Sequence, residues 1–595
     1  MHTTVYKEKA EQYSIKANQL QQKLGWLSFS RLVLFAGFIY LLYRSTQTGT
    51  AVAIVAAIAV FVVFIMIVKW YDRLQQQVSY YKALVKYNAD ETTFLETNRS
   101  TYSNGKEYED PHHPYSYDLD FFGAGGLYAH LNRCSTSFGK KELADLLLNP
   151  ETNTIARRQE AIRELAGLTD FRQQLYAKGS LQENREKDLK QLTDWIHSPK
   201  TGISKPLYFA LLIMPLVTIG SLLYYMFVSD NNEVFRLIYL TFILNLAIAF
   251  SFGKKIAQQL SVSTSVNKIL AAYRDQLRSI EEQQFQAPLL QQYQQQLKDN
   301  TQTASMRLHQ LASLFEYLES IINLIVSILL NGLFLFHIHI LYRLGNWKQK
   351  HAAQIPGWLE VIGKLEALGS LGNFSFNNPE NCFPEISTGP DLQAMALGHP
   401  LIKKEKRVCN DIRFHEQQFI ILTGSNMSGK STFLRTVGMN LALAKSGSAV
   451  TASRLVFYPF DVFVSMRITD SLQESESFFY AELKRLQTIV QHLEQGNKTF
   501  VILDEILRGT NSNDKRNGTI GLIRKLAAFD TFGIIATHDV MVADLIKEYP
   551  SYIANKAFES EIVNDELLFD YKLKNGVCTK LSASYLMKKL GVIDQ

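Results

Sequence analysis

The stretch that most constrains the fold of this chain of 595 residues is FIILTGSNMSGKST, residues 419–432. Four apolar residues of buried-strand character lead into GSNMSGKS, which fits the pattern G-x-x-x-x-G-K-[ST]. Gly424 and Gly429 permit backbone angles that other residues resist, so successive N–H groups can turn inward around phosphate oxygens. The pattern predicts a nucleotide site, with Lys430 on the β and γ phosphates and the Ser431 hydroxyl on Mg²⁺. A chance glycine-rich turn is the alternative.

Two further apolar runs end in polar side chains. Residues 500–503, FVIL, lead into Asp504 and Glu505, and residues 532–536 lead into Thr-His-Asp with His538 at the centre. The carboxyl ends of parallel strands are where open α/β sheets bind ligands. We therefore expect Asp504 to hold Mg²⁺ through water, Glu505 to orient or deprotonate the attacking water, and His538 to sense the γ-phosphate. A purely structural histidine is the alternative for His538.

These motifs resemble the ATPase domain of the MutS family, through TGSNMSGKST, SESFFYAE, LDEILRGTNS and ATHD, with VCNDIRFHEQQFIILTG upstream. The resemblance implies that ATP and Mg²⁺ are bound by Asn410, Gly424, Ser425, Asn426, Met427, Ser428, Gly429, Lys430, Ser431 and Thr432. It also implies a homodimer, in which a signature segment of one subunit completes the ATP site of its partner. Ser477 and Glu482 are read as residues that act across that interface. Leu507 stands where the family has glycine, and Ser475 and Glu476 replace its Gly-Arg.

A weaker resemblance covers the middle of the chain. DLDFFGAGGLYAHLNRCSTSFGKKELADLLL, followed by RRQEAI, is similar to the start of the MutS core domain. The Gln-rich helices expected over residues 254–320 correspond in the family to levers that join the ATPase to a DNA clamp; solvated helices or a coiled coil are the alternative. Apolar segments occupy the place before the core, so we do not carry over the family's recognition of mispaired bases. DNA remains a candidate partner.

Two pairs of apolar segments predict transmembrane hairpins. Residues 27–43 and 51–68 are each long enough to cross a bilayer, and only RSTQTGT joins them closely. Residues 207–228 and 234–252 form the second pair, joined by the polar SDNNE. Asn245 interrupts the last segment, which is tolerable if it faces another helix. A signal anchor or a soluble core hairpin is the alternative for the first pair.

The flanking charges predict how these hairpins are oriented. Positive residues flank the hairpins at Lys7, Lys9, Lys16, Lys23, Lys69, Arg73, Lys254 and Lys255, and the two turns hold little positive charge beyond Arg44 and the nearby Arg236. By the positive-inside rule, the ATPase should lie in the cytoplasm, below an inner or plasma membrane that the chain crosses several times. A fifth apolar stretch, residues 321–340, contains asparagine, serine and histidine, and we interpret it as a buried core helix rather than a span.

Composition adds only broad limits. The chain is too long for one hydrophobic core, so several domains are expected. A net charge of +6 permits contact with nucleic acid or acidic lipid but demands neither. The 4 cysteines are far apart without a C-x-x-C pair, which argues against a zinc site or a disulfide framework and fits a reducing compartment.

Together these features predict an α/β ABC-type P-loop ATPase domain at the C-terminus, an all-α MutS-like core and lever domain, and two transmembrane helical hairpins. The expected divisions are a cytoplasmic N-terminal helix (1–25), hairpin 1 (26–70), the first part of the core (71–205), hairpin 2 (206–253), lever and core helices (254–389) and the ATPase domain (390–595). The expected function is that of a membrane-anchored, homodimeric, Mg²⁺-dependent ATPase, with hairpin 2 in place of part or all of the DNA clamp. A nucleotide-switched membrane scaffold without a DNA role and an ABC-type transporter subunit are the alternatives, and no protein partner can be named.

Overall fold

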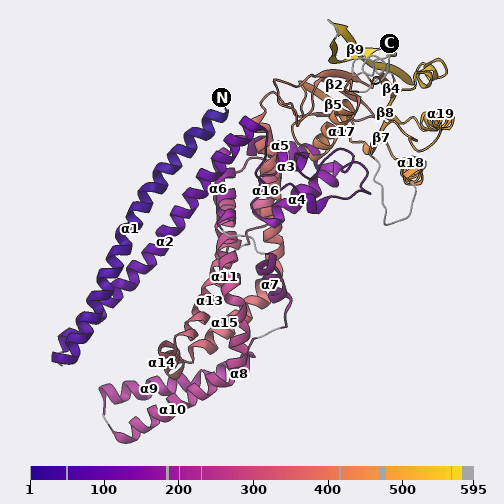
Figure 1. The fold of residues 1–595 in the computed structure, drawn as a ribbon. Helices are drawn as coiled ribbons and strands as arrows, with labels where there is room; N and C mark the ends of the chain where they lie inside the picture. The colour runs from indigo at the N-terminus through magenta and orange to yellow at the C-terminus, as the bar shows by residue number, and fades with distance from the viewer. Residues whose placement is uncertain are drawn as a thin grey trace.

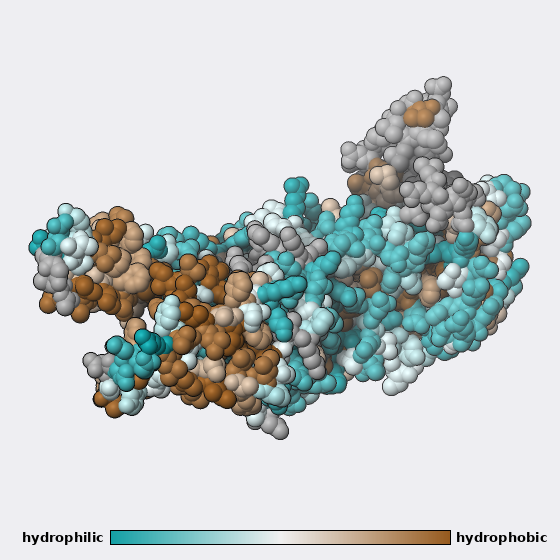
Figure 2. All heavy atoms as spheres, turned by 90° about the horizontal axis from the view of Figure 1, so that it is seen from below, coloured by the Kyte–Doolittle hydropathy of each residue, from teal (hydrophilic) through white to brown (hydrophobic). Residues whose placement is uncertain are grey.

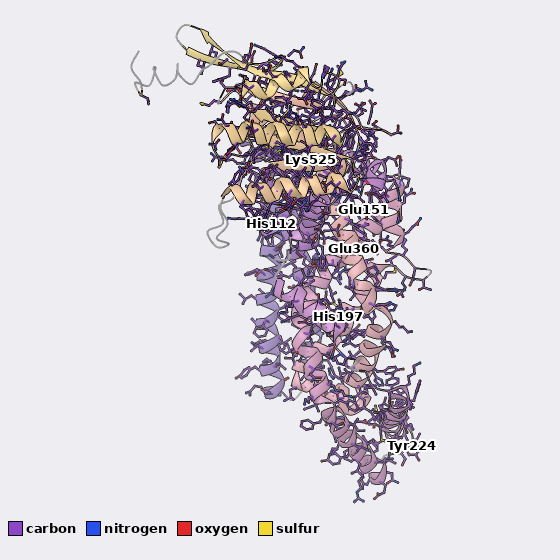
Figure 3. All side chains as sticks on the ribbon, turned by 90° about the vertical axis from the view of Figure 1, so that its right-hand side faces the viewer. His112, Glu151, His197, Tyr224, Glu360 and Lys525 are labelled. Carbon is purple, nitrogen blue, oxygen red and sulfur yellow. The ribbon has the colours of Figure 1, made fainter. Side chains whose placement is uncertain are left out.

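The computed structural model describes residues 2–48, 51–181, 186–199, 202–229, 231–299, 301–414, 417–425, 427–467, 478–563, 566–578 and 592. Figure 1 shows an elongated molecule, with a domain of β-sheets at one end and long helices running away from it. Two helical hairpins lie toward the other end. The side view in Figure 3 places Lys525 in the sheet domain and Tyr224 at the opposite end of the molecule.

The first hairpin consists of α1 (His2–Thr48) and α2 (Ala51–Thr97). The next helices are η1 (Lys106–Tyr108), α3 (Leu127–Leu131), α4 (Ser137–Leu148), η2 (Thr152–Thr154), α5 (Ile155–Gly167), α6 (Thr169–Ser180) and α7 (Glu186–His197). The second hairpin is built from α8 (Lys205–Leu211), α9 (Ile213–Phe227) and α10 (Asn232–Ser251). The lever region contains α11 (Gly253–Glu282), α12 (Pro288–Gln295), α13 (Ala304–Glu319), η3 (Ser320–Ile322), α14 (Leu324–Phe334), α15 (Phe336–His351), η4 (Ala352–Gln354) and α16 (Ile355–Asn377).

The sheet domain contains a six-stranded sheet in the order β10-β9-β4-β8-β7-β6. Its strands are β4 (Phe419–Gly424), β6 (Asp461–Ser465), β7 (Thr499–Asp504), β8 (Phe532–Thr537), β9 (Ile553–Val563) and β10 (Glu566–Asn575). All neighbours pair in parallel except β9 and β10, which are antiparallel. A smaller sheet has the order β1-β5-β2-β3, with β1 (Glu385–Ile386), β2 (Leu392–Leu397), β3 (Asn410–Arg413) and β5 (Arg454–Phe457).

Helices cover both faces of the large sheet, which explains why its central strands β4, β7 and β8 are buried at every position. Ile420 and Leu422 of β4 belong to the same core as α17 (Lys430–Ser446). Phe419 and Ile421 of the same strand face a second core, formed with α18 (Phe478–Glu494), α19 (Ser512–Ala528) and η5 (Val540–Lys547). Successive side chains of β4 therefore point alternately into the two cores on either side of the sheet.

The first hairpin is held to the core by buried polar groups. The Tyr6 hydroxyl of α1 and the Tyr87 hydroxyl of α2 both donate to Asn373 of α16, each at 3.2 Å. Glu91 of α2 forms an ion pair with Arg133 and both side chains are almost fully buried. Buried donors and acceptors are stable only when they find partners, so this network fixes where the hairpin docks.

Four helical segments are long and apolar enough to cross a membrane: Thr3–Gln47, Val52–Thr97, Lys205–Phe227 and Asn232–Ser251. They lie where the sequence predicts its two hairpins. Figure 2, seen from below, shows apolar surface on both hairpins, at the end away from the sheet domain. Asn245 meets the expectation set for it, because its side chain is fully buried against neighbouring helices.

The prediction of a buried core helix over residues 321–340 is wrong for the first part of this stretch, whereas Leu335, Ile338 and Ile340 in its second part do lie buried in the core. The chain breaks there into η3, α14 and α15, with Leu335 in the left-handed conformation at φ 49°. The apolar side chains of Ile322, Leu324 and Ile325 are exposed rather than buried. Asparagine and histidine in this stretch serve to turn the chain, and periodicity alone did not reveal those turns.

Candidate nucleotide site

The loop between β4 and α17 needs glycine at both ends. A Cβ at Gly424 would lie 2.8 Å from the Ser428 Oγ and 2.9 Å from the carbonyl oxygen of Phe558. Gly429 has φ 99° and precedes the first turn of α17. Met427 has φ 68° and an exposed side chain, while the predicted ligand Asn426 lies outside the described residues. The left-handed backbone at Met427 and Gly429, directly before the N-terminus of α17, is of the kind that phosphate-binding loops use.

Lys430 lies at the centre of this loop. Its ammonium donates to the carbonyl oxygens of Gly424 at 2.9 Å and Ser425 at 3.0 Å, and burial lowers its pKa. The buried hydroxyls of Ser425 and Ser428 have no hydrogen-bond partner among the residues that the structure describes. A buried polar group without a partner is costly, so these hydroxyls fit a site that receives an oxygen-rich ligand.

The two predicted metal ligands are in contact. The Ser431 hydroxyl donates to Asp504 Oδ2 at 2.6 Å. Ser431 lies in the first turn of α17, the helix after β4, and Asp504 ends β7. Strand β8 lies between β4 and β7, so the carboxyl ends of these parallel strands share one edge of the sheet. A hydroxyl and a carboxylate side by side are oxygen ligands of the kind that Mg²⁺ takes together with water and phosphate. The residues present therefore fit the metal.

Glu505 and His538 form a second pair at the same edge. His538 Nε2 lies 2.5 Å from Glu505 Oε1, and this hydrogen bond lowers the pKa of Glu505 to about 2. The Lys430 ammonium lies 3.4 Å from the same histidine nitrogen. Glu505 adopts φ 49°, and its N–H donates to the carbonyl oxygen of Ala536 on β8 at 3.0 Å. The carboxylate is thereby held beside the phosphate loop.

Most of the phosphate loop and Glu505 line a cavity of about 400 Å³, while Asp504 and His538 lie outside its lining. The predicted residues that line it are Asn410, Met427, Ser428, Gly429, Lys430, Ser431, Thr432 and Glu505. His399 and Tyr571 also line it, although no sequence motif pointed to them. Burial lowers the pKa of His399 to about 4, so its ring is neutral near pH 7. A cavity of this size, lined by both apolar and polar side chains, suits a nucleotide.

Asn410 shapes this cavity through β10. Its amide donates to the carbonyl oxygen of Tyr571 at 3.0 Å and its Oδ1 accepts from the Leu573 N–H at 2.9 Å. Tyr571 has φ 53° at an irregularity of β10, and its ring lies beside Gly429. Both polar atoms of Asn410 are thus engaged within the chain, and it positions the tyrosine in addition to lining the cavity.

Glu482 differs from the expectation that it acts across a dimer interface. Its carboxylate, on α18, is buried and accepts from the N–H groups of Leu507 at 2.6 Å and Arg508 at 3.2 Å in its own chain. It therefore fixes the loop that follows Glu505. Ser475, Glu476 and Ser477 lie outside the described residues.

Leu507 occupies a position that would suit glycine. Its φ is 60°, a left-handed angle that is unfavourable for a residue with a Cβ. Its side chain packs against Gly518 of α19, where an additional methyl group would collide with it. Gly518 has no side chain and therefore leaves room for the Leu507 side chain. The MutS family has glycine at the position of Leu507.

The helical core contacts the nucleotide domain through the segment that contains Asp118 and Asp120. The sequence linked this segment to the core only by its resemblance to the MutS core domain. Asp118 accepts from the N–H groups of Met466 and Arg467, both at 2.7 Å, at the end of β6. Asp120 forms an ion pair with Arg435 of α17. Because α17 begins at the phosphate loop, this ion pair links the helix that follows the loop to the helical core.

Comparisons with known proteins agree with this geometry. Residues 420–592 match the family described as MutS domain V. The "DNA mismatch repair protein MutS" of Thermotoga maritima is 29% identical over 253 residues, which cover 42% of this chain and 31% of that protein. The protein of the same name from Thermotoga neapolitana is 31% identical over 238 residues, covering 39% and 29%. "MutS protein homolog 4" of Homo sapiens is 27% identical over 253 residues, covering 40% and 25%.

The chain therefore spans a third or less of the length of these curated relatives. The shared part contains the phosphate loop, both carboxylates at the end of β7 and the histidine after β8. By this match, residues 420–592 of the chain form a domain of the kind described as MutS domain V.

Proposed function

We propose that this chain is a Mg²⁺-dependent ATPase, anchored in a membrane, whose nucleotide cycle moves its lever helices. The observation that carries the proposal is the meeting of three groups around one cavity: Lys430 in the phosphate loop, the Ser431–Asp504 pair and the Glu505–His538 pair. Each group corresponds to one need of phosphoryl transfer, namely charge neutralisation, metal placement and control of the attacking water.

The chain's own residues divide the work as follows. Ser431 and Asp504 would hold Mg²⁺, which when bound supplies positive charge to the phosphate oxygens. Lys430 exchanges its two loop carbonyls for phosphate oxygens when ATP enters. Glu505 positions water, but a carboxylate with a pKa of about 2 is a weak base while His538 donates to it. Movement of His538 toward the γ-phosphate frees Glu505, so hydrolysis waits for a correctly placed nucleotide.

The test is steady-state ATP hydrolysis by the full-length protein in detergent or nanodiscs. Glu505→Gln should lower turnover on the order of 100-fold or more while fluorescent ATP analogues still bind. Lys430→Ala should abolish binding itself. Glu494→Gln is the matched control, because Glu494 forms an exposed ion pair with Lys525 away from the cavity. Wild-type turnover in Glu505→Gln would remove this residue from the mechanism.

Membrane anchoring is supported by the four apolar helices and by their flanking lysines and arginines. We place the protein in an inner or plasma membrane with the sheet domain in the cytoplasm. Extraction of cell membranes with alkaline carbonate tests the anchoring. Release of the intact chain into the soluble fraction would contradict it.

Dimerisation and DNA contact are proposals that rest on the family. Sedimentation of Glu505→Gln with and without ATP tests the homodimer. If this variant binds ATP without cleaving it, the ATP-bound dimer should accumulate. A monomer under both conditions would refute it. Binding to homoduplex, mismatched and branched DNA at rising salt tests the second proposal, because phosphate contacts weaken steeply with salt. Negligible binding at low salt would favour a nucleotide-switched scaffold.

A further inference from the structure

The far end of the lever carries an apolar elbow formed by η3, α14 and the start of α15. Helix α13 and helix α14 meet at an angle of 109°. Leu335, at φ 49°, then turns the chain into α15. No charged residue lies between Glu319 and Arg343. The elbow thus projects an uncharged helix sideways from the lever.

The outer face of this elbow is apolar and uncovered. Ile322, Leu324 and Ile325 are 73%, 72% and 72% exposed. The inner face of α14 packs against α10 and α9. Figure 2 shows extensive apolar surface in the region of these helices at this end of the molecule. Contiguous apolar patches of this kind are rare on soluble monomers and mark contact with a membrane or a partner.

One buried amide ties α14 to the second hairpin. Asn245 of α10 donates to the carbonyl oxygen of Gly332 on α14 at 2.8 Å and to the Thr218 hydroxyl of α9 at 3.1 Å. A Cβ at Gly332 would collide with the ring of Phe242, so glycine permits this close approach. Small residues at helix contacts and polar side chains that bond between helices are the means by which helices associate in lipid.

The polar groups at the two ends of α14 are satisfied inside the elbow. The Asn323 side chain caps the helix by accepting from the Val326 N–H at 3.2 Å. Asn331 donates to the carbonyl oxygen of Ser327 at 2.9 Å, and its Oδ1 accepts from the His337 N–H at 3.1 Å. The His337 ring contacts the Ser320 hydroxyl at 3.2 Å. Irregular backbone is tolerated at membrane depth only when protein groups satisfy it in this way.

We propose that α14 is a re-entrant helix that inserts into the hydrocarbon layer of a bilayer beside α9 and α10. The inference rests on the proposed membrane anchoring and adds that the lever itself carries a membrane-embedded tip. The occupant of this face is lipid rather than a second copy of the chain. The exposed face of α14 adjoins α9 and α10, whose segments are long and apolar enough to cross a membrane, and it carries no charged residue that could form an ion pair with a partner. Helices α13 and α15 connect this tip to α16, so a nucleotide-driven motion of the lever would reach the bilayer directly.

Nitroxide scanning of the full-length protein in lipid nanodiscs tests the proposal. The label is attached to single cysteines at position 325 on α14, position 244 on α10 and position 306 on α13, in a chain carrying Cys382→Ala and Cys409→Ala. Leu244 and Met306 are both exposed in the structure, so they are matched controls for lipid and for water. Collision rates with oxygen and with a water-soluble nickel chelate report the surroundings of each label.

We expect the ratio of oxygen to nickel collisions at position 325 to equal that at 244 and to exceed that at 306 several-fold. If 244 lies in lipid but 325 behaves like 306, the re-entrant helix is refuted and the anchoring stands. If 244 also behaves like 306, the anchoring fails and this inference fails with it. Low collision rates with both reagents at 325, together with dipolar broadening between labels, would show a contact between copies and overturn the lipid assignment.

Discussion

The buried ion pair between Arg133 and Glu91 tests how the first hairpin is coupled to the helical core. The Arg133 side chain is 3% exposed and that of Glu91 is fully buried. The second carboxylate oxygen accepts from the amides of Asn373 at 3.1 Å and Asn377 at 2.9 Å. These amides belong to α16, so one carboxylate joins α2, the segment after α3 and α16.

Arg133→Met should destabilise the core by about 3–5 kcal/mol, because it leaves the Glu91 carboxylate buried without its counter-charge. Glu91→Gln should cost less, about 1.5–3 kcal/mol, since Arg133 keeps its hydrogen bonds to the carbonyl oxygens of His130 and Asn132. The double variant removes both members of this buried ion pair. We therefore expect it to be more stable than Arg133→Met alone, although one substitution has been added.

The assay is thermal unfolding in nanodiscs, followed by the fluorescence of the core residues Trp195, Trp347 and Trp358. For a unit of this size each kcal/mol shifts the midpoint by roughly 2–4 °C, so Arg133→Met should lower it by about 6–20 °C. Arg278→Met is the control, because its ion pair with Glu282 is exposed and worth under about 1 kcal/mol. A midpoint for Arg133→Met within about 2 °C of wild type, or a double variant less stable than that single one, would refute the reasoning.

Two other predictions concern the site and the core. Glu482→Leu should lower ATP turnover about tenfold or more with little change in nucleotide affinity, because it releases the N–H groups of Leu507 and Arg508 but does not touch the phosphate loop; an equal loss of affinity would contradict this. Burial lowers the pKa of His130 to about 3, below its ordinary value of 6.5. The unfolded chain therefore binds more protons between these two pKa values, and stability should fall as pH falls through this window, by about 2 kcal/mol at pH 5. His130→Phe should flatten the decline of the thermal midpoint between pH 7 and pH 5, and an unchanged slope would exclude this histidine as its source.

Much of the nucleotide site could be predicted from the chain alone. The apolar runs of β4, β7 and β8 identify strands covered on both faces, and parallel strands necessarily bring their carboxyl ends to one edge. Asp504, Glu505 and His538 therefore had to lie near the phosphate loop. The structure agrees, with Asp504 on Ser431 and Glu505 on His538.

Other parts of the site depend on contacts between distant segments. Tyr571 reaches the cavity because β10 lies beside β3 and Asn410 of β3 hydrogen-bonds to the Tyr571 backbone. No local sequence pattern predicts that position. Glu482 lies in a segment that suggested a role in a partner subunit. Whether its carboxylate faces outward or toward Leu507 depends on how α18 packs, which the order of residues does not reveal.

The apolar segments show the same division most clearly. Their composition determined that residues 27–43, 51–68, 207–228 and 234–252 form helices with largely apolar surfaces, in which Arg31 and Arg236 are the only charged residues, since a long apolar run must satisfy its backbone internally. Residues 321–340 are equally apolar, yet the sequence could not distinguish a helix buried in protein from one facing outward, because the same side chains suit both surroundings. Only the tertiary structure decided this, through the turn at Leu335 and the bond from Asn245 to Gly332, which leave one face of α14 without protein to cover it.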